Sequence, residues 1–239
     1  MLLVFEKLIL VLVEAALETV PPEIQGHPSV LNEARRRGKA PDMLLLDRSY
    51  HHHAMKHLQN SYKRGRPDIV HFCLLEALGS PLNIAGLLQV YVSTQRGYVI
   101  AVNPSVRLPR VYERFKGLME QLFAESVVKS SEGTELLRLE RKTLRELVEE
   151  VGPSAKVLMG EGGRLAGMME FRRRFVSSPR PLVMVGGFPH GDFSEETKKL
   201  ADEVLSLHQR PLEAWTVVSR VLCFAEAGLE KLKPIKTTL

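Results

Sequence analysis

PLVMVGGF, at residues 181–188, is the clearest strand pattern in the chain. A short branched apolar run of this kind is typical of a strand buried on both faces. It leads directly into Gly186 and Gly187. Small ligands bind at the carboxyl ends of strands in open α/β sheets, and glycine lets the backbone approach them closely. The stretch therefore predicts a central strand followed by either a ligand loop or a tight turn. It matches neither GxGxxG nor GxxxxGK[ST], so dinucleotide and P-loop sites lack support.

Similar patterns extend outward from this strand. KVLMG at 156–160 predicts a strand before a glycine-rich turn, SEETKKLADEVLSL at 194–207 a helix capped by Ser194, and residues 213–232 a long helix. Nearer the start, the patterns predict buried strands at 8–14 and 43–47, a helix at 29–39 with Ser29 as its cap, and a hairpin at 87–94 and 97–103. Strands that alternate with helices predict an α/β fold with a mainly parallel sheet.

Composition bounds the class of protein. A chain of 239 residues holds one or two domains, and we expect one compact domain. Cys73 and Cys223 both lie in apolar helix-like runs, which predicts neither a disulfide framework nor a zinc site. The first apolar run contains Glu14 and Glu18, so it is too charged to span a bilayer, and we expect a cytoplasmic protein with no membrane partner. A formal charge of +5 favours a polyanionic partner.

A cationic segment is the first candidate for function. Arg107, Arg110 and Arg114 are three and four residues apart, and Arg66 extends the set. The pattern 111–125 predicts an amphipathic helix with Arg114 and Lys116 on its exposed face. If Arg110 and Arg114 share one face of that helix, they form a ridge that can pair with successive phosphates. A merely solvated helix face is the alternative.

Four histidines close in sequence are the second candidate. His51, His52, His53 and His57 have the i and i+4 spacing that puts ligands on one helix face, but no HExxH pattern accompanies them. We therefore predict no metal site, and interpret these residues as an exposed or RNA-facing patch.

Longer motifs resemble a known family, the ribosome-biogenesis pseudouridine N(1)-methyltransferases of the SPOUT class (Emg/Nep family). The resemblance covers residues 8 to 230 and is carried by RPDIVHFCLLEALGSPLNIAGLLQVYVSTQRG, VNPSVRLPRVYERFKGLMEQL, VGGFPHGDF and LSLHQRPLEAW, in this order. Many relatives have an acidic residue just before SPLN, where this chain has Gly79.

The resemblance implies a SPOUT-type trefoil-knot fold with helices on both faces of the sheet. It implies one methyltransferase domain over 1–239, with an inserted basic, His-rich and hairpin region at about 48–104 and the knot at about 155–230. It also implies a homodimer and S-adenosylmethionine as methyl donor. The family's donor loops map to Met159, Gly186, Gly191, Leu207, His208, Gln209, Arg210, Pro211 and Leu212.

The implied reaction is methylation of ring nitrogen 1 of a pseudouridine in small-subunit ribosomal RNA. The family's RNA-facing arginines map to the cationic set: Arg66, Arg107, Arg110 and Arg114. Of these we expect Arg66 and Arg110 to assist catalysis by positioning and electrostatics, because a sulfonium methyl is already electrophilic. Ribosomal proteins are further candidate partners. The alternative function is a non-catalytic assembly factor that binds ribosomal RNA through the same arginines.

Overall fold

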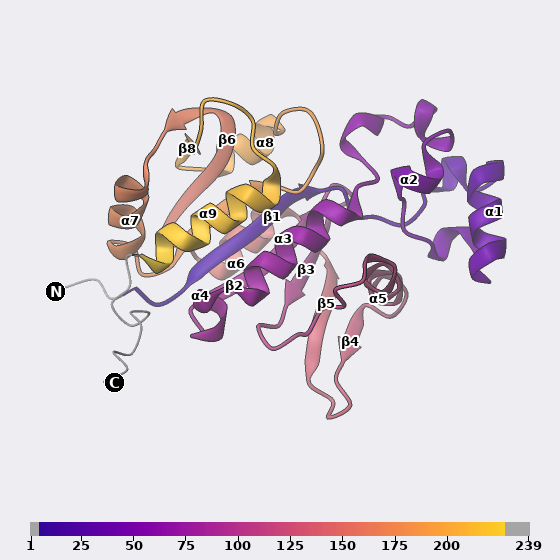
Figure 1. Ribbon diagram of the computed structural model, residues 1–239, viewed down its shortest axis with the longest axis horizontal. Coiled ribbons are helices and arrows are strands. Elements are labelled where there is room, and N and C mark those ends of the chain that lie inside the picture. The colour runs from indigo at the N-terminus through magenta and orange to yellow at the C-terminus, as the bar shows by residue number, and fades with distance from the viewer. Residues whose placement is uncertain (1–4, 228–239) are drawn as a thin grey trace, which may run out of the picture.

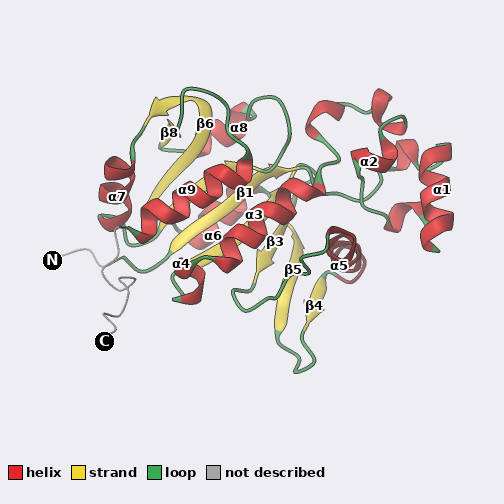
Figure 2. Ribbon diagram, in the orientation of Figure 1, coloured by secondary structure: helices red, strands yellow, loops and turns green. Residues whose placement is uncertain are grey.

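An eight-stranded sheet forms the centre of the computed structural model, which describes residues 5–227, with the backbone alone at 175 and 176. The strand order is β4-β5-β3-β2-β1-β7-β6-β8 (Figures 1 and 2). Strands β2, β1, β7, β6 and β8 run parallel, whereas β3, β5 and β4 continue the sheet antiparallel. The strands are β1 Leu8–Ala15, β2 Leu88–Thr94, β3 Tyr98–Val102, β4 Val127–Lys129, β5 Glu135–Arg141, β6 Ala155–Leu165, β7 Pro181–Gly186 and β8 Glu203–Ser206.

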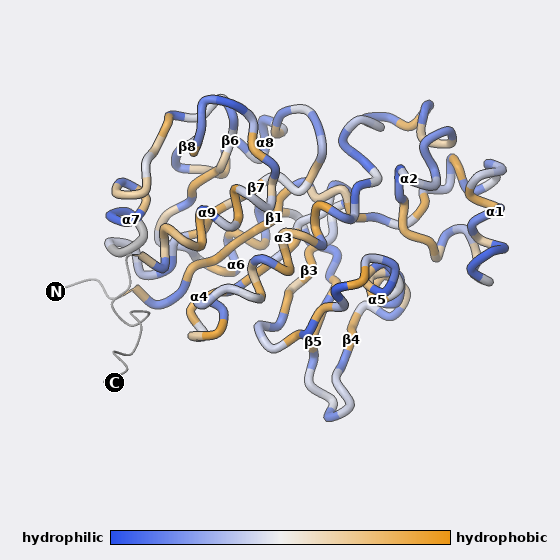
Figure 3. Tube along the Cα trace, in the orientation of Figure 1, coloured by the Kyte–Doolittle hydropathy of each residue, from blue (hydrophilic) through white to orange (hydrophobic). Residues whose placement is uncertain are grey.

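Helices cover both faces of this sheet. One face is covered by α3 (Pro67–Gly79), α4 (Pro81–Ile84), α5 (Tyr112–Glu125), α7 (Met168–Val176) and α9 (Ala214–Glu226). The other face is covered by α6 (Leu144–Val151), and by Phe193 and Ala201, which flank α8 (Glu195–Leu200). Figure 3 shows apolar stretches along β1, α3 and α9, where these elements pack. The predicted α/β class, mainly parallel sheet and two-sided helical cover are confirmed.

The nearly continuous apolar run of β1 follows from its burial on both faces of the sheet. Side chains alternate between the faces of a strand. The residues Leu8, Leu10 and Leu12 belong to one core cluster, and Ile9, Val11 and Val13 belong to the other. All six are fully buried. A parallel strand covered on both faces has no solvent side on which to place polar residues.

A small helical lobe, residues 19–66, projects beyond the carboxyl end of β1 (Figure 1). It contains α1 (Pro28–Arg37), α2 (Arg48–His51) and the short 3-10 turns Pro22–Ile24, Pro41–Met43, Ala54–His57 and Ser61–Lys63. The lobe has its own apolar core, made by residues such as Val20, Val30, Leu44 and Met55. Its chain returns to the sheet through α3. Strands β2 and β3, which fall within the region 48–104, lie inside the sheet, and β2 pairs directly with β1.

One local prediction is wrong, and two are correct only in part. Residues 43–47 do not form a strand, because Leu44 and Leu46 fill the core of the helical lobe and only Leu45 makes a single bridge, to Thr19. The helix at 194–207 ends at Leu200, and the residues after it form β8 because β6 offers them a backbone partner. The helix predicted at 29–39 is present as α1, but its cap is His27 and not Ser29; Nδ1 of His27 accepts from the amide of Ser29.

The glycine-rich segment after KVLMG also differs from the prediction. Rather than a turn, it continues β6 to Leu165, with a register shift between Met159 and Arg164. A Cβ on Gly163 would lie 2.6 Å from the carbonyl carbon of Leu205, so glycine is required where β6 passes beside β8.

The remaining elements agree with the patterns. The predicted strands at 8–14 and 181–188, the hairpin and the helix at 111–125 are confirmed. The helix at 213–232 is confirmed up to Glu226, and residues 228–232 lie outside the described part. No helix within residues 5–227 is long and apolar enough to cross a membrane.

Candidate functional site

Three of the sequence-predicted donor segments meet at one edge of the sheet. In the parallel register Met159 of β6 lies beside Val185 of β7 and Leu205 of β8. The segments that follow these residues, which include Gly186 and Leu207, therefore start side by side. This is the carboxyl edge at which α/β sheets bind small ligands. Gly191 lies farther along the loop after β7, in an exposed turn with a φ of +95°.

The glycine pair after β7 is packed tightly by protein atoms. A Cβ on Gly187 would lie 2.9 Å from Cα of Ala15, and a Cβ on Gly186 would lie 3.0 Å from the ring of Phe188 and 3.2 Å from that of Phe193. The distance at Gly187 is shorter than real Cβ atoms show, whereas a Cβ on Gly186 would require the two rings to shift by a few tenths of an ångström. The close approach that these glycines permit is thus to the end of β1 and to two aromatic rings.

The helical lobe holds the same loop from the other side. Lys63 lies 2.6 Å from a carboxylate oxygen of Glu14 and 4.1 Å from the centre of the Phe188 ring. The second oxygen of Glu14 accepts from the amide of Ser194. Burial opposes ionisation of Glu14, but the hydrogen bonds from Lys63 and Ser194 outweigh it and lower its pKa. Glu14 has a φ of +49°, an uncommon conformation for a non-glycine residue.

The loop after β8 presents main-chain groups to solvent. His208, Gln209, Arg210, Pro211 and Leu212 are exposed, and Leu207 is half-buried. The hydroxyl of Ser206 donates to the carbonyl of His208, and the amide of Arg210 donates to Nδ1 of His208. Within the described chain, the amides of Gln209 and Leu212 donate to no protein group. Free amides beside the converging strand ends suit a nucleoside held by backbone hydrogen bonds.

The predicted arginines do not share one helix face. Helix α5 begins at Tyr112, so Arg110 lies in the preceding loop and only Arg114 lies on the helix. That expectation is wrong, although Arg107, Arg110 and Arg114 are all exposed, and none forms an ion pair with any residue between 5 and 227. Three unpaired guanidinium groups remain available to an anionic partner.

Arg66 differs from the other three because it is paired. It lies at the N-cap of α3, where its Nε donates to Asp68 at 2.8 Å and its Nη2 donates to the same carboxylate at 2.8 Å. The hydrogen bond with Asp68 raises the pKa of Arg66, and the negative charge of Glu213 acts in the same direction. Glu213 follows the loop after β8.

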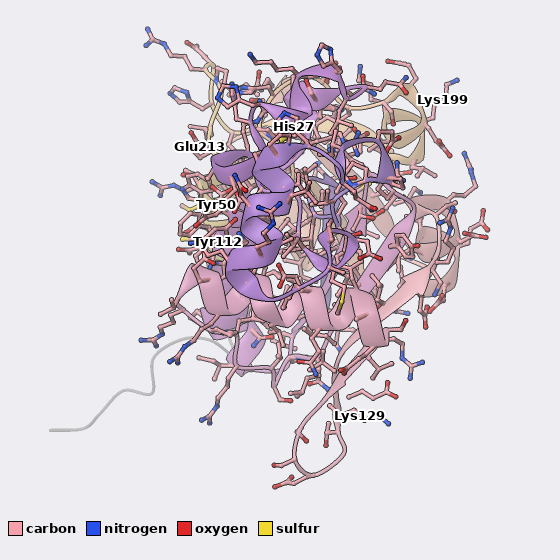
Figure 4. All side chains as sticks on the ribbon, turned by 90° about the vertical axis from the view of Figure 1, so that its right-hand side faces the viewer. His27, Tyr50, Tyr112, Lys129, Lys199 and Glu213 are labelled. Atoms are coloured by element: carbon pink, nitrogen blue, oxygen red, sulfur yellow. The ribbon has the colours of Figure 1, made fainter. Side chains whose placement is uncertain are left out.

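Lys116 is buried, contrary to the prediction that it lies on an exposed face. Its Nζ lies 3.3 Å from Glu33 and 3.2 Å from Asp47, both buried residues of the helical lobe. The rings of Tyr50 and Tyr112, labelled next to each other in Figure 4, lie 4.2 and 5.8 Å from the same Nζ. The residues next to Lys116 in the sequence do not predict its burial, because its ionic partners Glu33 and Asp47 are far away in the chain.

The four histidines do not form a cluster. His51 is buried, with Nε2 2.8 Å from Glu33, whereas His52, His53 and His57 are exposed. Among residues 5–227, no group of His, Cys, Asp and Glu side chains is arranged to hold a metal ion.

Comparisons with known proteins agree with this geometry. The model of the EMG1/NEP1 methyltransferase family matches residues 10–226. The ribosomal RNA small subunit methyltransferase Nep1 of Thermococcus kodakarensis is 49% identical over 220 residues, which are 92% of this chain and 98% of that protein. The protein of the same name from Pyrococcus furiosus is 47% identical over 217 residues, 91% of this chain and 95% of its own.

A solved structure gives the same result. The crystal structure of Archaeoglobus fulgidus Nep1 bound to S-adenosylhomocysteine matches with a TM-score of 0.81 and 41% sequence identity. The match covers 94% of this chain and 98% of that one. The two chains therefore have the same fold over nearly their full lengths.

Proposed function

Because this chain belongs to the EMG1/NEP1 methyltransferase family, we propose that it transfers a methyl group from S-adenosylmethionine to small-subunit ribosomal RNA. The observation that carries the proposal is the full-length match to a Nep1 structure bound to S-adenosylhomocysteine, the product that this donor leaves after methyl transfer. The placement of Met159 of β6 beside the ends of β7 and β8 supports a donor site at the carboxyl edge of the sheet. The acceptor that the sequence motifs favour is N1 of a pseudouridine.

The donor loops supply binding and orientation. S-adenosylmethionine, when bound, contributes a sulfonium methyl that needs only alignment with a nucleophilic nitrogen. The free amides of Gln209 and Leu212 would hold the adenosine part through the main chain. Met159 is buried within β6, beside Val185 of β7 and Leu205 of β8, and would give this edge an apolar contact. We place Gly186, Gly191 and the remaining residues of the loop 207–212 around the same site.

The arginines bind and orient the RNA. Exposed Arg107, Arg110 and Arg114 pair with phosphates, which position the substrate without reading its sequence. The target base must leave its stack to reach the donor edge. Asp68 holds Nε and Nη2 of Arg66 and leaves Nη1 free. A fixed guanidinium with one free nitrogen can stabilise the negative charge that develops on the uracil carbonyls as N1 loses its proton.

A homodimer fits an apolar surface on α3 and α9. Phe72 of α3 is 46% exposed and meets Trp215 of α9 edge to face, with ring centres 5.2 Å apart. A groove of about 380 Å³ between the two helices is lined by Leu75, Leu222 and Cys223, with Glu76 and Glu226 among its polar residues. A second copy of the chain would cover this surface.

We propose the cytoplasm, where ribosomal subunits are assembled in cells without a nucleus, as the place of action.

The test is a transfer assay on the full chain. The protein is incubated with isotopically labelled donor and small-subunit ribosomal RNA that carries pseudouridine, and RNA fragments are analysed by mass spectrometry. We expect one labelled methyl group on one pseudouridine. Labelled uridine would overturn the assignment of the acceptor, and RNA binding without any transfer would favour the assembly-factor alternative.

A further inference from the structure

The loop before α5 carries two of the free arginines and needs a support. This arginine loop, residues 103–111, contains Arg107 and Arg110 and joins β3 to α5. Val106 and Leu108 are buried on either side of exposed Arg107, so the loop is anchored to the core by alternate side chains. Apolar anchors alone leave its backbone carbonyls to be satisfied by other groups.

His71 supplies one of these groups from the middle of α3. Its Nε2 lies 2.8 Å from the carbonyl oxygen of Pro109, between the two arginines. The ring is 1% exposed and stacks on Phe115 of α5, with centres 4.2 Å apart. His71 thus joins α3 to the arginine loop by a hydrogen bond and to α5 by a ring contact.

The tautomer of His71 follows from its surroundings. A carbonyl oxygen can only accept, so the nitrogen that faces Pro109 must carry the proton. Nδ1 is buried and has no hydrogen-bond partner among the described residues. With the proton on Nδ1, the ring would have a buried N–H without a partner, and Nε2 and the carbonyl oxygen of Pro109 would face each other as two acceptors. Burial lowers the pKa of His71, which keeps the ring in the neutral Nε2–H form.

Two further side chains hold the ends of the same loop. The amide nitrogen of Asn83 donates to the carbonyls of Leu78 and Pro104, both at 3.0 Å. The hydroxyl of Tyr112 donates to buried Asp47 at 2.8 Å. The loop is therefore fixed at its start to the end of α3, at its end to the helical lobe, and between the arginines to His71.

The placement of His71 on α3 gives its bond a specific consequence. Arg66 is the N-cap of this helix, and His71 lies little more than one turn farther along. The helix therefore carries one RNA-facing arginine directly and, through the carbonyl of Pro109, sets the place of two others. Asn83 and Tyr112 hold the loop ends, whereas His71 holds the residue next to Arg110.

We propose that His71 is a positioning residue for RNA binding, whose Nε2–H fixes Arg107 and Arg110 relative to Arg66 by donating to Pro109. The inference rests on the proposed function, because the position of these arginines matters only if they bind RNA. His71 does not contact the substrate. Without its hydrogen bond the loop samples other positions, and the apparent affinity for RNA falls by the fraction of molecules that remain competent.

Two variants separate the hydrogen bond from the packing. His71→Phe keeps a ring against Phe115 and removes the donor, whereas His71→Gln places an amide nitrogen near the position of Nε2 and removes the ring. The full chain is titrated with a transcript of small-subunit ribosomal RNA and, separately, with S-adenosylhomocysteine. Thermal unfolding shows whether each variant is folded. We expect His71→Phe to raise the RNA dissociation constant about fivefold to tenfold, the range of one net hydrogen bond. His71→Gln should recover most of this loss, and both variants should bind S-adenosylhomocysteine as the wild type does.

The possible results lead to different conclusions. Unchanged RNA affinity in folded His71→Phe, or an equal loss in both variants, would overturn the positioning role. If neither variant folds, nitrogen chemical shifts of the His71 ring in the wild type decide, since a proton on Nδ1 is incompatible with the proposed bond. A wild-type protein that binds neither RNA nor S-adenosylhomocysteine would instead refute the proposed function, before any variant is compared.

Discussion

Gly187 shows how a single residue sets the shape of the donor edge. Its amide donates to the carbonyl of Val13 and its carbonyl accepts from the amide of Ala16, so it joins the ends of β7 and β1 from both sides. A side chain at this position would collide with Ala15, whose backbone cannot move without breaking these bonds.

We predict that Gly187→Ala destabilises the protein and weakens donor binding. Overpacking of this kind costs about 1–3 kcal/mol. The control is Gly162→Ala, because a Cβ on Gly162 meets no atom within 4 Å and its φ is not positive. Urea unfolding and calorimetry with S-adenosylhomocysteine measure both effects. Equal behaviour of the two variants would show that the contact with Ala15 does not matter.

Arg110 is the residue on which the division between RNA binding and donor binding is best tested. It is exposed, lies outside the donor loops, and forms no ion pair within residues 5–227. We predict that Arg110→Glu weakens RNA binding by about tenfold or more, the worth of a charge-assisted hydrogen bond, and reduces the salt dependence by about one phosphate contact. Affinity for S-adenosylhomocysteine should not change.

Arg145→Glu is the matched control for this charge reversal. Arg145 is exposed on α6, across the sheet from α3 and α5. Similar losses of RNA affinity in both variants would indicate a general effect of net charge, and parallel losses of donor affinity would contradict separate sites.

At the scale of elements, the contact between α5 and the helical lobe depends on buried charges. Lys116 of α5 meets Glu33 of α1 and Asp47, the cap of α2, and Glu120 one turn later pairs with Arg37 and Lys39. Buried ions are costly unless they are paired, so each side chain here depends on the others.

Removing the cation from this cluster should be strongly destabilising. Lys116→Met leaves Glu33 and Asp47 without their common partner, and the loss is expected to be about 3–5 kcal/mol. Arg145→Met removes an exposed cation and should change stability little. Denaturant unfolding at neutral pH compares the two, and a Lys116→Met protein as stable as the control would contradict the role of the cluster.

The same cluster predicts sensitivity to acid. Burial disfavours the ionised forms of Glu33 and Asp47, but Lys116 together with His51 and Tyr112 outweighs burial and lowers both pKa values below 4.5 and 3.8. Groups with a lowered pKa in the folded state stabilise it above the unfolded pKa, and this stability is lost as the pH falls through the folded pKa. The free energy of unfolding should therefore decrease from about pH 5 downward.

Unfolding by urea at a series of pH values between about 7 and 3 measures this dependence. In Lys116→Met the slope below about pH 5 should be smaller than in the wild type. Identical slopes would mean that other carboxylates dominate the acid response.

At the scale of the whole molecule, the α3–α9 surface is expected to make the dimer. A glutamate in place of Phe72 would have to be buried unpaired between two copies, so Phe72→Glu should convert the dimer to a monomer. Light scattering coupled to size exclusion measures the mass. Met43→Glu is the control, since Met43 is 45% exposed and lies in the helical lobe, outside α3 and α9. A wild-type protein that is monomeric at micromolar concentration would refute this interface.

Elements with strong local patterns could be predicted from the amino-acid sequence. The apolar runs at 8–14 and 181–188 predict strands because each residue's environment follows from the two-residue period and the cover on both faces. The hairpin, the helix at 111–125 and the exposure of Arg114 on that helix also follow from nearby residues. The long motifs identified the family, and the trefoil knot over 155–230 stays a prediction.

Features whose partners are distant in the chain became apparent from the folded molecule alone. Lys116 is buried because Glu33, 83 residues earlier, meets it across the lobe, and residues 203–206 are a strand because β6 lies beside them. Gly187 is required by Ala15, and His71 has a role because Pro109 faces it. Local periodicity reflects the average surroundings of a segment, whereas burial of a charge or the fit of a glycine depends on atoms that folding brings together.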